Sequence, residues 1–373
     1  MNSRARVMAA VFRKPVDRIP VDFWARADVT AALIKYLGLE TEEQLLRKLG
    51  SDFRYVSIGE NHEAYLKKTN GVLKGQSENS GKPYIFHGDG TYENEWGIVY
   101  RESEAGLYDE WVAGPFSETD DLDINAFDWP SINGSTGDGP GGSLFEDVES
   151  IRKRVDKYKG EYAVLAGLNY PFKTCWHMRG WENYLCDMLA DEDSAIALWR
   201  KSAEYEKEKG LRLIRAGVDI IGLYGDIAMQ DRMMYSLESY RKIDKPIFAE
   251  MISAFKKENP DILVFYHSDG DMSSVIPDLI EIGVDIINPV QPECMDVENI
   301  KRQYGDKVTL HGTISIQETM PGPIEGVRKE VEDRLRIYGD GGLIICPANA
   351  LQNDTPLENI LEIYRTAKSI EAK

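Results

Sequence analysis

The residues best suited to chemistry in this chain are an imidazole and a carboxylate two positions apart, His267 and Asp269. They directly follow an apolar run, residues 262–266, and Gly270 comes next. A neutral imidazole suits metal binding, and a partly protonated one suits proton transfer; the alternative is a core histidine bonded to a backbone carbonyl. Asp269 can be an oxygen ligand or can orient His267, although Asp before Gly is also a common turn carboxylate.

Two further reactive side chains end apolar runs elsewhere. Asp226 follows the buried pattern of residues 222–225, and Cys346 ends the run 343–346. A carboxylate at the end of a buried strand is desolvated unless it is paired, which favours a site role for Asp226. The alternative is that Asp226 caps the N-terminus of a helix. A thiolate is the softest protein ligand for zinc, but a free cysteine is often only a small buried apolar residue.

These side chains need a scaffold that brings the ends of several strands together. Apolar runs that predict strands lie at residues 19–24, 53–57, 162–168, 218–225, 262–266, 284–290, 308–311 and 343–346. Helical patterns follow most of them, for example over residues 29–37, 42–49 and 181–216. Alternating strands and helices predict a parallel α/β sheet, because each crossover needs its own helix. Eight such units predict a (β/α)8 TIM barrel, with an open doubly wound sheet as the alternative.

In such a barrel the carboxyl ends of the strands form one rim, where sites are built. We therefore expect His267, Asp226 and Asp269 there as catalytic residues. Aromatic residues near this rim are expected to line an apolar pocket suited to an aromatic ring, with ordinary packing as the alternative. They are Phe23, Trp24, Tyr55, Tyr170, Trp176, Trp181 and Tyr224, of which we assign Trp24, Trp176 and Tyr224 to substrate binding. His177 is a weaker candidate for the same pocket, and His311 is expected to be structural or exposed.

The stretch between the second and third strands breaks the alternation of strands and helices. Alternating segments at residues 84–86, 91–96 and 98–100, separated by glycines, predict antiparallel hairpins, and the Gly-rich residues 135–143 predict a loop. We interpret residues 70–143 as an insertion in a single domain that spans residues 1–373.

Composition excludes several functions. With 44 basic and 63 acidic residues the formal net charge is −19, which disfavours nucleic acid and anionic membranes as partners. Four cysteines without framework spacing and the lack of any long apolar stretch predict a cytoplasmic protein with reduced thiols.

Several motifs resemble those of the uroporphyrinogen decarboxylase family, including its branch of corrinoid-dependent methyltransferases. They lie at residues 18–21, 49–54, 267–279, 288–292, 347–352 and 354–359, so that the resemblance runs nearly end to end. It implies a (β/α)8 barrel. Decarboxylases of this family carry a Met-Arg-Gln-Ala-Gly-Arg stretch after the first strand, whose arginines bind substrate carboxylates. Here only Arg26 remains in that stretch, and Asp28 follows it. One arginine is too few for a tetrapyrrole with many carboxylates.

The methyltransferase branch holds zinc with a His-x-Cys motif and a later Cys. Here His267 matches, whereas Asp269 and Asn349 stand where the two cysteines would be. We therefore expect His267, Asp269 and Cys346 to hold zinc with an open fourth position. Asn349 and Arg26 are both expected to bind substrate.

The resemblance implies a methyltransferase that moves a methyl group between a small methoxylated compound and a cobalt corrinoid. The aromatic rim favours demethylation of an aryl methyl ether. No corrinoid-binding segment is visible, so a separate corrinoid protein is the expected partner. The alternative is a decarboxylase of a tetrapyrrole or of a smaller carboxylated substrate, in which Asp226 or Asp52 stabilises a protonated intermediate without metal or partner.

Overall fold

A computed structural model of the 373-residue chain describes residues 1–58, 73–76, 83–94, 96–102, 109–119, 122–127, 129, 147–338 and 341–369. The loop expected at residues 135–143 lies outside these ranges. Among the described residues no helix is both long enough and apolar enough to cross a membrane.

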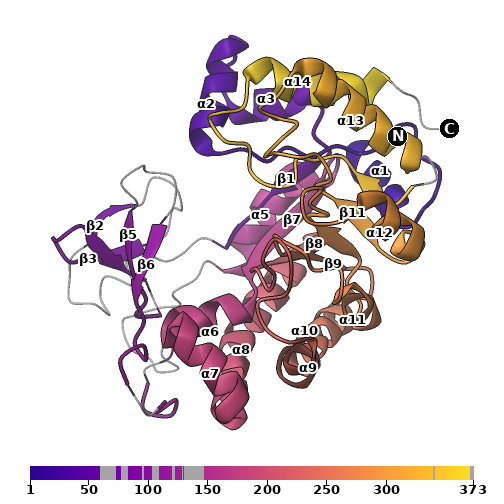
Figure 1. The fold of residues 1–373 in the computed structure, drawn as a ribbon. Coiled ribbons are helices and arrows are strands. Elements are labelled where there is room, and N and C mark those ends of the chain that lie inside the picture. The colour runs from indigo at the N-terminus through magenta and orange to yellow at the C-terminus, as the bar shows by residue number, and fades with distance from the viewer. Residues whose placement is uncertain are drawn as a thin grey trace.

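Seven parallel strands form the central sheet, shown in Figure 1 with helices around it. In spatial order they are β1 (Phe53–Tyr55), β7 (Ala163–Asn169), β8 (Ile220–Tyr224), β9 (Leu263–His267), β10 (Ile286–Asn288), β11 (Thr309–His311) and β12 (Leu343–Ile344). This order follows the chain order, as in a barrel in which every strand pairs with the next. Seven of the eight expected strands are therefore confirmed, although most are shorter than their apolar runs.

The eighth wall is the N-terminal segment that was expected to be a regular strand at residues 19–24. It forms only isolated bridges, in which Val21 pairs with Ile345 and Ala25 with Leu351. On its other side the Asp52 N–H donates to the Val21 carbonyl at 2.9 Å, next to β1. Pro20 has no N–H and so removes one ladder bond, which explains the broken pairing. The segment nevertheless closes the sheet, and the (β/α)8 barrel is confirmed.

Helices surround this barrel, and the first of them closes its amino end, where Val7 and Val11 pack on the interior residues Phe53 and Ile344. The helices are α1 (Ser3–Val11), α2 (Ala27–Tyr36), α3 (Glu42–Leu49), α5 (Val148–Lys159), α6 (Pro171–Arg179), α7 (Trp181–Ala190), α8 (Glu192–Ala216), α9 (Leu237–Ser239), the π-helix η1 (Tyr240–Asp244), α10 (Lys245–Glu258), α11 (Ile276–Glu281), α12 (Val297–Tyr304), α13 (Ile324–Ile337) and α14 (Leu357–Ser369). The long helix expected over residues 181–216 is interrupted at Asp191, whose backbone ends α7 and whose carboxylate caps the N-terminus of α8.

The expected antiparallel region is a separate five-stranded sheet in the order β2 (Leu73–Gln76), β3 (Pro83–Phe86), β4 (Thr91–Glu93), β5 (Val99–Glu102) and β6 (Asp109–Ala113). Strands β2 and β6 were not expected. Strand β6 has no buried face, so its sequence lacks the apolar alternation by which strands are recognised. Trp111 attaches this sheet to the barrel layer, since its indole N–H donates to the His177 carbonyl on α6 at 2.7 Å.

The amino end of the barrel is closed by buried ion pairs. The Asp52 carboxylate accepts from Arg6 and Arg18, both at 2.7 Å, and from the Val21 N–H at 2.9 Å. Arg54 instead pairs with Glu43 at 2.7 Å. Asp52 precedes β1 and thus lies at the end of the barrel opposite the rim, which makes it a structural residue and unsuited to the catalytic role considered for it.

Candidate active site

Side chains that point into the barrel alternate along each strand. Phe53, Phe265 and Ile286 belong to one apolar cluster inside it. His267 lies two residues after Phe265, and Asn288 two residues after Ile286, so both side chains face the same interior at the carboxyl rim. The register pairs His267 with Tyr224 on one side and with Asn288 on the other. The three residues therefore occupy one level of the barrel.

His267 faces two carboxylates. Its Nε2 atom lies 3.9 Å from Asp226 Oδ1 and 3.9 Å from Asp269 Oδ1. These separations are too long for direct hydrogen bonds and leave room for a small ion or a substrate atom. The backbone N–H of Asp269 donates to Asp226 Oδ1 at 2.8 Å, which holds the two acidic residues together. The three expected catalytic residues are thus brought into one cluster.

The cluster is partly accessible from the rim. The side chain of His267 is 13% exposed, that of Asp226 41% and that of Asp269 38%. Burial raises the pKa of Asp269 above its ordinary value, and the like charge of Asp226 adds to this effect. Asn349, expected to bind substrate, donates its amide to Asp269 Oδ2 at 2.6 Å. Asp269 therefore has one occupied oxygen and one that faces His267.

Asn288 is a site residue that sequence reasoning missed. Its side-chain oxygen lies 2.6 Å from His267 Nδ1, and its side-chain nitrogen 2.8 Å from His311 Nδ1. A polar residue at the end of the apolar run Ile286-Ile287 was the available signal, the same signal that identified His267.

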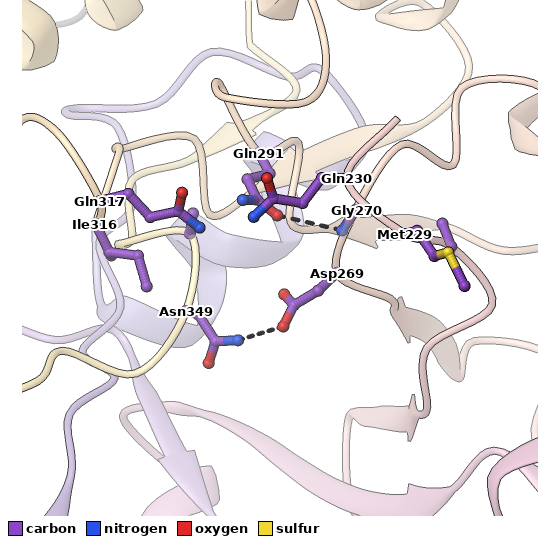
Figure 2. A pocket seen from close by; sticks show the side chains of 10 residues that line it. Met229, Gln230, Asp269, Gly270, Gln291, Ile316, Gln317 and Asn349 are labelled. Atoms are coloured by element: carbon purple, nitrogen blue, oxygen red, sulfur yellow. Dashed lines mark hydrogen bonds between the residues drawn. The ribbon is translucent and has the colours of Figure 1, made fainter. Parts of the chain in front are cut away.

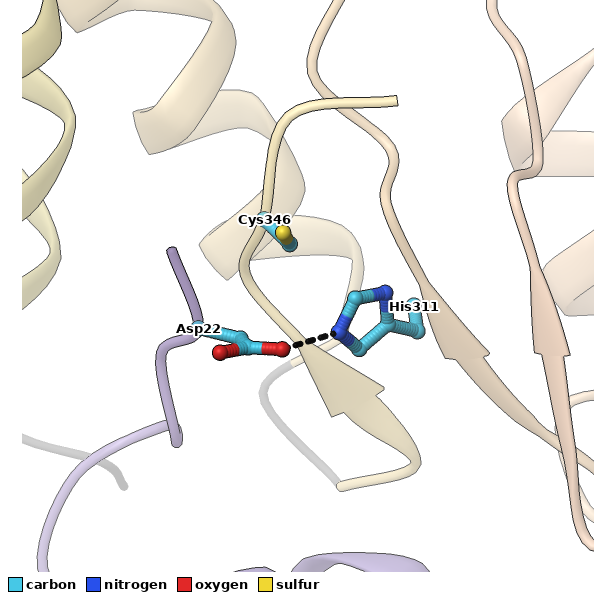
Figure 3. Close-up of side chains that lie close together, drawn as sticks. All are labelled: Asp22, His311 and Cys346. Carbon is cyan, nitrogen blue, oxygen red and sulfur yellow. Dashed lines mark hydrogen bonds and ion pairs between the residues drawn. The ribbon is translucent and has the colours of Figure 1, made fainter. Parts of the chain in front are cut away.

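Cys346 does not join His267 and Asp269 in one ligand set, contrary to our expectation. Among the described residues, the potential ligand atoms within 4.8 Å of one another form two groups, Asp226 with His267 and Asp269, and Asp22 with His311 and Cys346. The second group is shown in Figure 3. The cause is the strand order, because Cys346 follows β12, three positions from β9 in the sheet. Burial also raises the pKa of its thiol well above the ordinary value.

An aromatic cluster lies directly beside His267. The Trp24 ring centroid is 5.8 Å from that of His267 and 6.0 Å from that of Tyr224. Gly222 leaves space for Tyr224, since a Cβ there would be 2.7 Å from its ring. Tyr55 is 43% exposed, but its hydroxyl donates to buried Asp22, and burial of this group raises its pKa well above the ordinary value. Trp24 and Tyr224 therefore lie at the site as expected.

Other expected contacts lie elsewhere. Trp176 packs on Trp181, with ring centroids 5.3 Å apart, and does not line the pocket described below. His177 next to it bonds to the Tyr100 hydroxyl at 2.7 Å, and burial lowers its pKa to about 3. Arg26 precedes α2 and donates to Asp28 at 3.2 Å, so that the acid noted in the sequence offsets part of its charge.

A pocket of about 210 Å³ opens beside Asp269 (Figure 2). Its lining residues are Ala228, Met229, Gln230, Asp269, Gly270, Gln291, Ile316, Gln317, Ala348 and Asn349. Four of these ten residues carry a neutral amide and none carries a positive charge. Gly270 has a φ of +86°, and a Cβ there would lie 2.2 Å from the Met229 carbonyl oxygen, so no other residue fits.

Together the fold and the site define a (β/α)8-barrel protein with an acid–imidazole site at the carboxyl rim. The family model for uroporphyrinogen decarboxylase (URO-D) matches residues 137–370, more than half of the chain. This protein belongs to the uroporphyrinogen decarboxylase family, an enzyme family, which confirms the resemblance of its motifs.

Two individual proteins are similar to it. A uroporphyrinogen decarboxylase from Trichodesmium erythraeum (strain IMS101) is 21% identical over 240 residues, which cover 61% of this chain and 63% of that protein, less than two thirds of its length. The solved structure of a methyltransferase from Methanosarcina mazei superposes with a TM-score of 0.70 over 99% of both chains at 15% identity. At that identity the superposition supports the barrel fold alone.

Proposed function

We propose that this protein is a methyltransferase that moves a methyl group between a small molecule at the barrel rim and a cobalt corrinoid carried by a separate protein. The observation that carries the proposal is the cluster of His267, Asp226 and Asp269 beside a small pocket lined by amides. The family and the likeness to a structure named methyltransferase are consistent with it.

The pocket argues against a tetrapyrrole as substrate. Its volume of about 210 Å³ lies below the range of about 300–1,000 Å³ for pockets that hold drug-sized ligands. A substrate with many carboxylates also needs cations to offset its charge, and the ten lining residues supply none. Gln230, Gln317 and the Gln291 amide nitrogen instead suit a small, neutral, polar molecule, with Ile316 and Met229 as the apolar part of the lining.

The chain's own residues can assist departure of the oxygen when a methyl ether loses its methyl group. The methyl carbon would form its new bond with the electron pair of the reduced Co(I) corrinoid, while the C–O bond breaks with its electron pair left on oxygen. That oxygen then needs a proton or another electrophile. Burial raises the pKa of Asp269 and so favours its protonated form, and Oδ1 is its oxygen facing His267. Transfer of this proton to the leaving oxygen would leave Asp269 ionised beside His267.

The same three residues suit a zinc ion. One imidazole nitrogen and two carboxylate oxygens within 4.8 Å of one another match the nitrogen and oxygen ligands of catalytic zinc with open positions. Zinc held by His267, Asp226 and Asp269 would supply a Lewis acid for the substrate oxygen. This set replaces the expected one by exchanging Cys346 for Asp226.

The test is a methyl-transfer assay with purified protein. Methoxylated aromatic and aliphatic compounds are offered together with reduced cobalamin as a free corrinoid, and methylation of the cobalt is followed by absorbance. We expect methylation that depends on both the protein and one class of methyl donor. If no donor supports transfer to free cobalamin or to a corrinoid protein encoded nearby, the proposal is wrong.

A decarboxylase remains the second candidate, because the family and the Trichodesmium relative carry that name. Here a protonated Asp269 could donate to the carbanion that forms when CO2 leaves. Release of CO2 from a small carboxylated compound without corrinoid and after chelation of metals would favour this candidate.

A further inference from the structure

A line of buried hydrogen bonds starts at His267 on β9 and runs through β10 and β11 to the N-terminal closing segment. His267 Nδ1 bonds to Asn288 Oδ1 at 2.6 Å, Asn288 Nδ2 to His311 Nδ1 at 2.8 Å, and His311 Nε2 to Asp22 Oδ2 at 3.1 Å. Asn288, His311 and Asp22 are at most 1% exposed. Water therefore competes little with these bonds, and each ring nitrogen must be matched to a donor or an acceptor.

The orientation of the Asn288 amide follows from a second contact. Its Nδ2 also lies 3.3 Å from the backbone carbonyl oxygen of His311. A carbonyl can only accept, so the NH2 end of the amide must face His311 and the oxygen must face His267. Gly312 makes room for this arrangement, because a Cβ there would be 2.3 Å from Asn288 Nδ2.

This orientation determines both histidine tautomers. His267 must carry its proton on Nδ1 to donate to the Asn288 oxygen, which leaves the Nε2 lone pair directed at Asp226 and Asp269. His311 accepts at Nδ1, so its proton is on Nε2 and is donated to Asp22. The two histidines thus have opposite tautomers.

We propose that Asn288 is a positioning residue that locks His267 in the tautomer with a free Nε2, and that the His311–Asp22 pair holds the amide in this orientation. The two potential metal groups are then not equivalent. The Nε2 of His267 is ready to accept a metal or a proton, whereas the Nε2 of His311 is already protonated. The group of Asp22, His311 and Cys346 is accordingly a support for the site and does not bind metal itself. The two tautomers are inferred from the hydrogen-bond geometry alone. The role of the His267 Nε2 lone pair in binding a metal or a proton rests on the proposed function.

The tautomers are tested by nitrogen NMR of protein with 15N-labelled histidine, at a pH at which the imidazoles are neutral. The chain has only five histidines, so each resonance pair can be assigned with single His→Gln variants. In the wild type we expect a protonated Nδ1 on His267 and a protonated Nε2 on His311. A wild-type His267 with its proton on Nε2 would overturn the proposal.

Two substitutions at position 288 separate positioning from simple packing. Asn288→Asp keeps an acceptor for His267 but removes the donor to His311. We expect the His267 tautomer to be retained and His311 to acquire a proton on Nδ1. Asn288→Leu removes both, and we expect His267 to shift towards the tautomer protonated on Nε2. If the His311 signals are unchanged in Asn288→Asp, the inferred orientation of the Asn288 amide is wrong. This variant is sufficient to test the orientation even if Asn288→Leu does not fold.

Titration with Co(II) and Zn(II) gives a second readout. We expect Asn288→Leu to weaken metal binding about 10- to 100-fold, as is usual when the partner of a ligating histidine is lost, and Asn288→Asp to restore most of it. Equal metal affinity in wild type and Asn288→Leu would contradict the positioning role. If the tautomers are as expected but neither metal binding nor methyl transfer is found, the proposed function fails and the tautomer assignment stands.

Discussion

At the scale of single residues, the site depends on an imidazole whose two nitrogens have different tasks. His267 Nδ1 is engaged by Asn288, while Nε2 is 3.9 Å from both acidic side chains. The side chain is only partly buried, so removing it should affect chemistry far more than folding. This separates it from Asp52 and His311, which are buried among partners that hold the barrel together.

We expect His267→Ala to lower kcat/KM about 100- to 10,000-fold, the usual contribution of a positioned acid, base or ligand. The thermal unfolding midpoint should fall by only a few degrees, the cost of leaving the buried Asn288 oxygen without its donor. The matched control is His87→Ala, since His87 is 38% exposed and pairs with Glu93 in the antiparallel sheet. A His267→Ala variant as active as this control would remove the imidazole from the mechanism.

Asp244, outside the site, makes a separate prediction for the pH dependence of stability. This carboxyl group ends the π-helix η1, and burial raises its pKa from 3.8 to about 7, although the hydroxyls of Tyr170 and Tyr235 donate to it. The folded state therefore binds a proton that the unfolded state releases near pH 4. Asp244 thus lowers the free energy of unfolding as pH rises from about 4 to about 7.

Asp244→Asn should remove this dependence and be more stable than the wild type at pH 8, by at most about 4 kcal/mol for a shift of about three pKa units. Urea unfolding of both proteins at pH 5 and pH 8 measures the difference. Asp231→Asn is the control, because that side chain is 71% exposed. If the difference in the free energy of unfolding between wild type and Asp244→Asn is the same at pH 5 and at pH 8, the assignment is wrong.

At the scale of elements, the ends of β8, β9 and β10 make the site, and the turns after them fix its geometry. Much of this was predictable, because apolar runs that end in polar residues mark strands that deliver side chains to the rim. The partners were not predictable in the same way. Cys346 carries the right chemistry but follows a strand three positions away, while Asn288 was overlooked although its strand is next to that of His267. Strand order and register decide such contacts, and neither is encoded in the local pattern.

The turn after β9 gives an element-scale prediction. Gly270→Ala should cost about 2–4 kcal/mol, because the residue has φ +86° and a Cβ would collide with the Met229 carbonyl. Displacement of the neighbouring Asp269 should also reduce activity.

The matched control for this substitution is Gly326→Ala in α13, where a Cβ meets nothing within 4 Å. There we expect no loss, or a gain of up to about 1 kcal/mol from helix propensity. Urea unfolding compares the two variants, and equal stabilities would show that the turn tolerates a side chain.

At the scale of the whole molecule, the barrel is closed by a segment with few ladder bonds and by one carboxylate. Asp52 accepts from Arg6 and Arg18 and also from the Val21 backbone, so it joins α1, β1 and the closing segment. Removing one partner of such a buried group leaves the remaining charges without compensation.

We expect Asp52→Ala to lower the free energy of unfolding by about 3–5 kcal/mol while KM stays unchanged in the fraction that remains folded. Urea unfolding and steady-state kinetics at a low temperature measure both quantities. Asp285→Ala is a comparison variant, because this carboxylate also pairs with a lysine and a strand N–H but is 25% exposed. A rise in KM without loss of stability would return Asp52 to the list of catalytic candidates.

The burial of Cys346 has a practical consequence for solution work. Cys186 on α7 is exposed, whereas Cys346 and Cys175 are enclosed. A maleimide dye added to the native protein should therefore attach at Cys186 first, and modification of Cys346 must wait until the barrel wall transiently separates. The rate at which Cys346 is alkylated, measured by mass spectrometry of its peptide, would therefore report the rate of transient opening of the barrel.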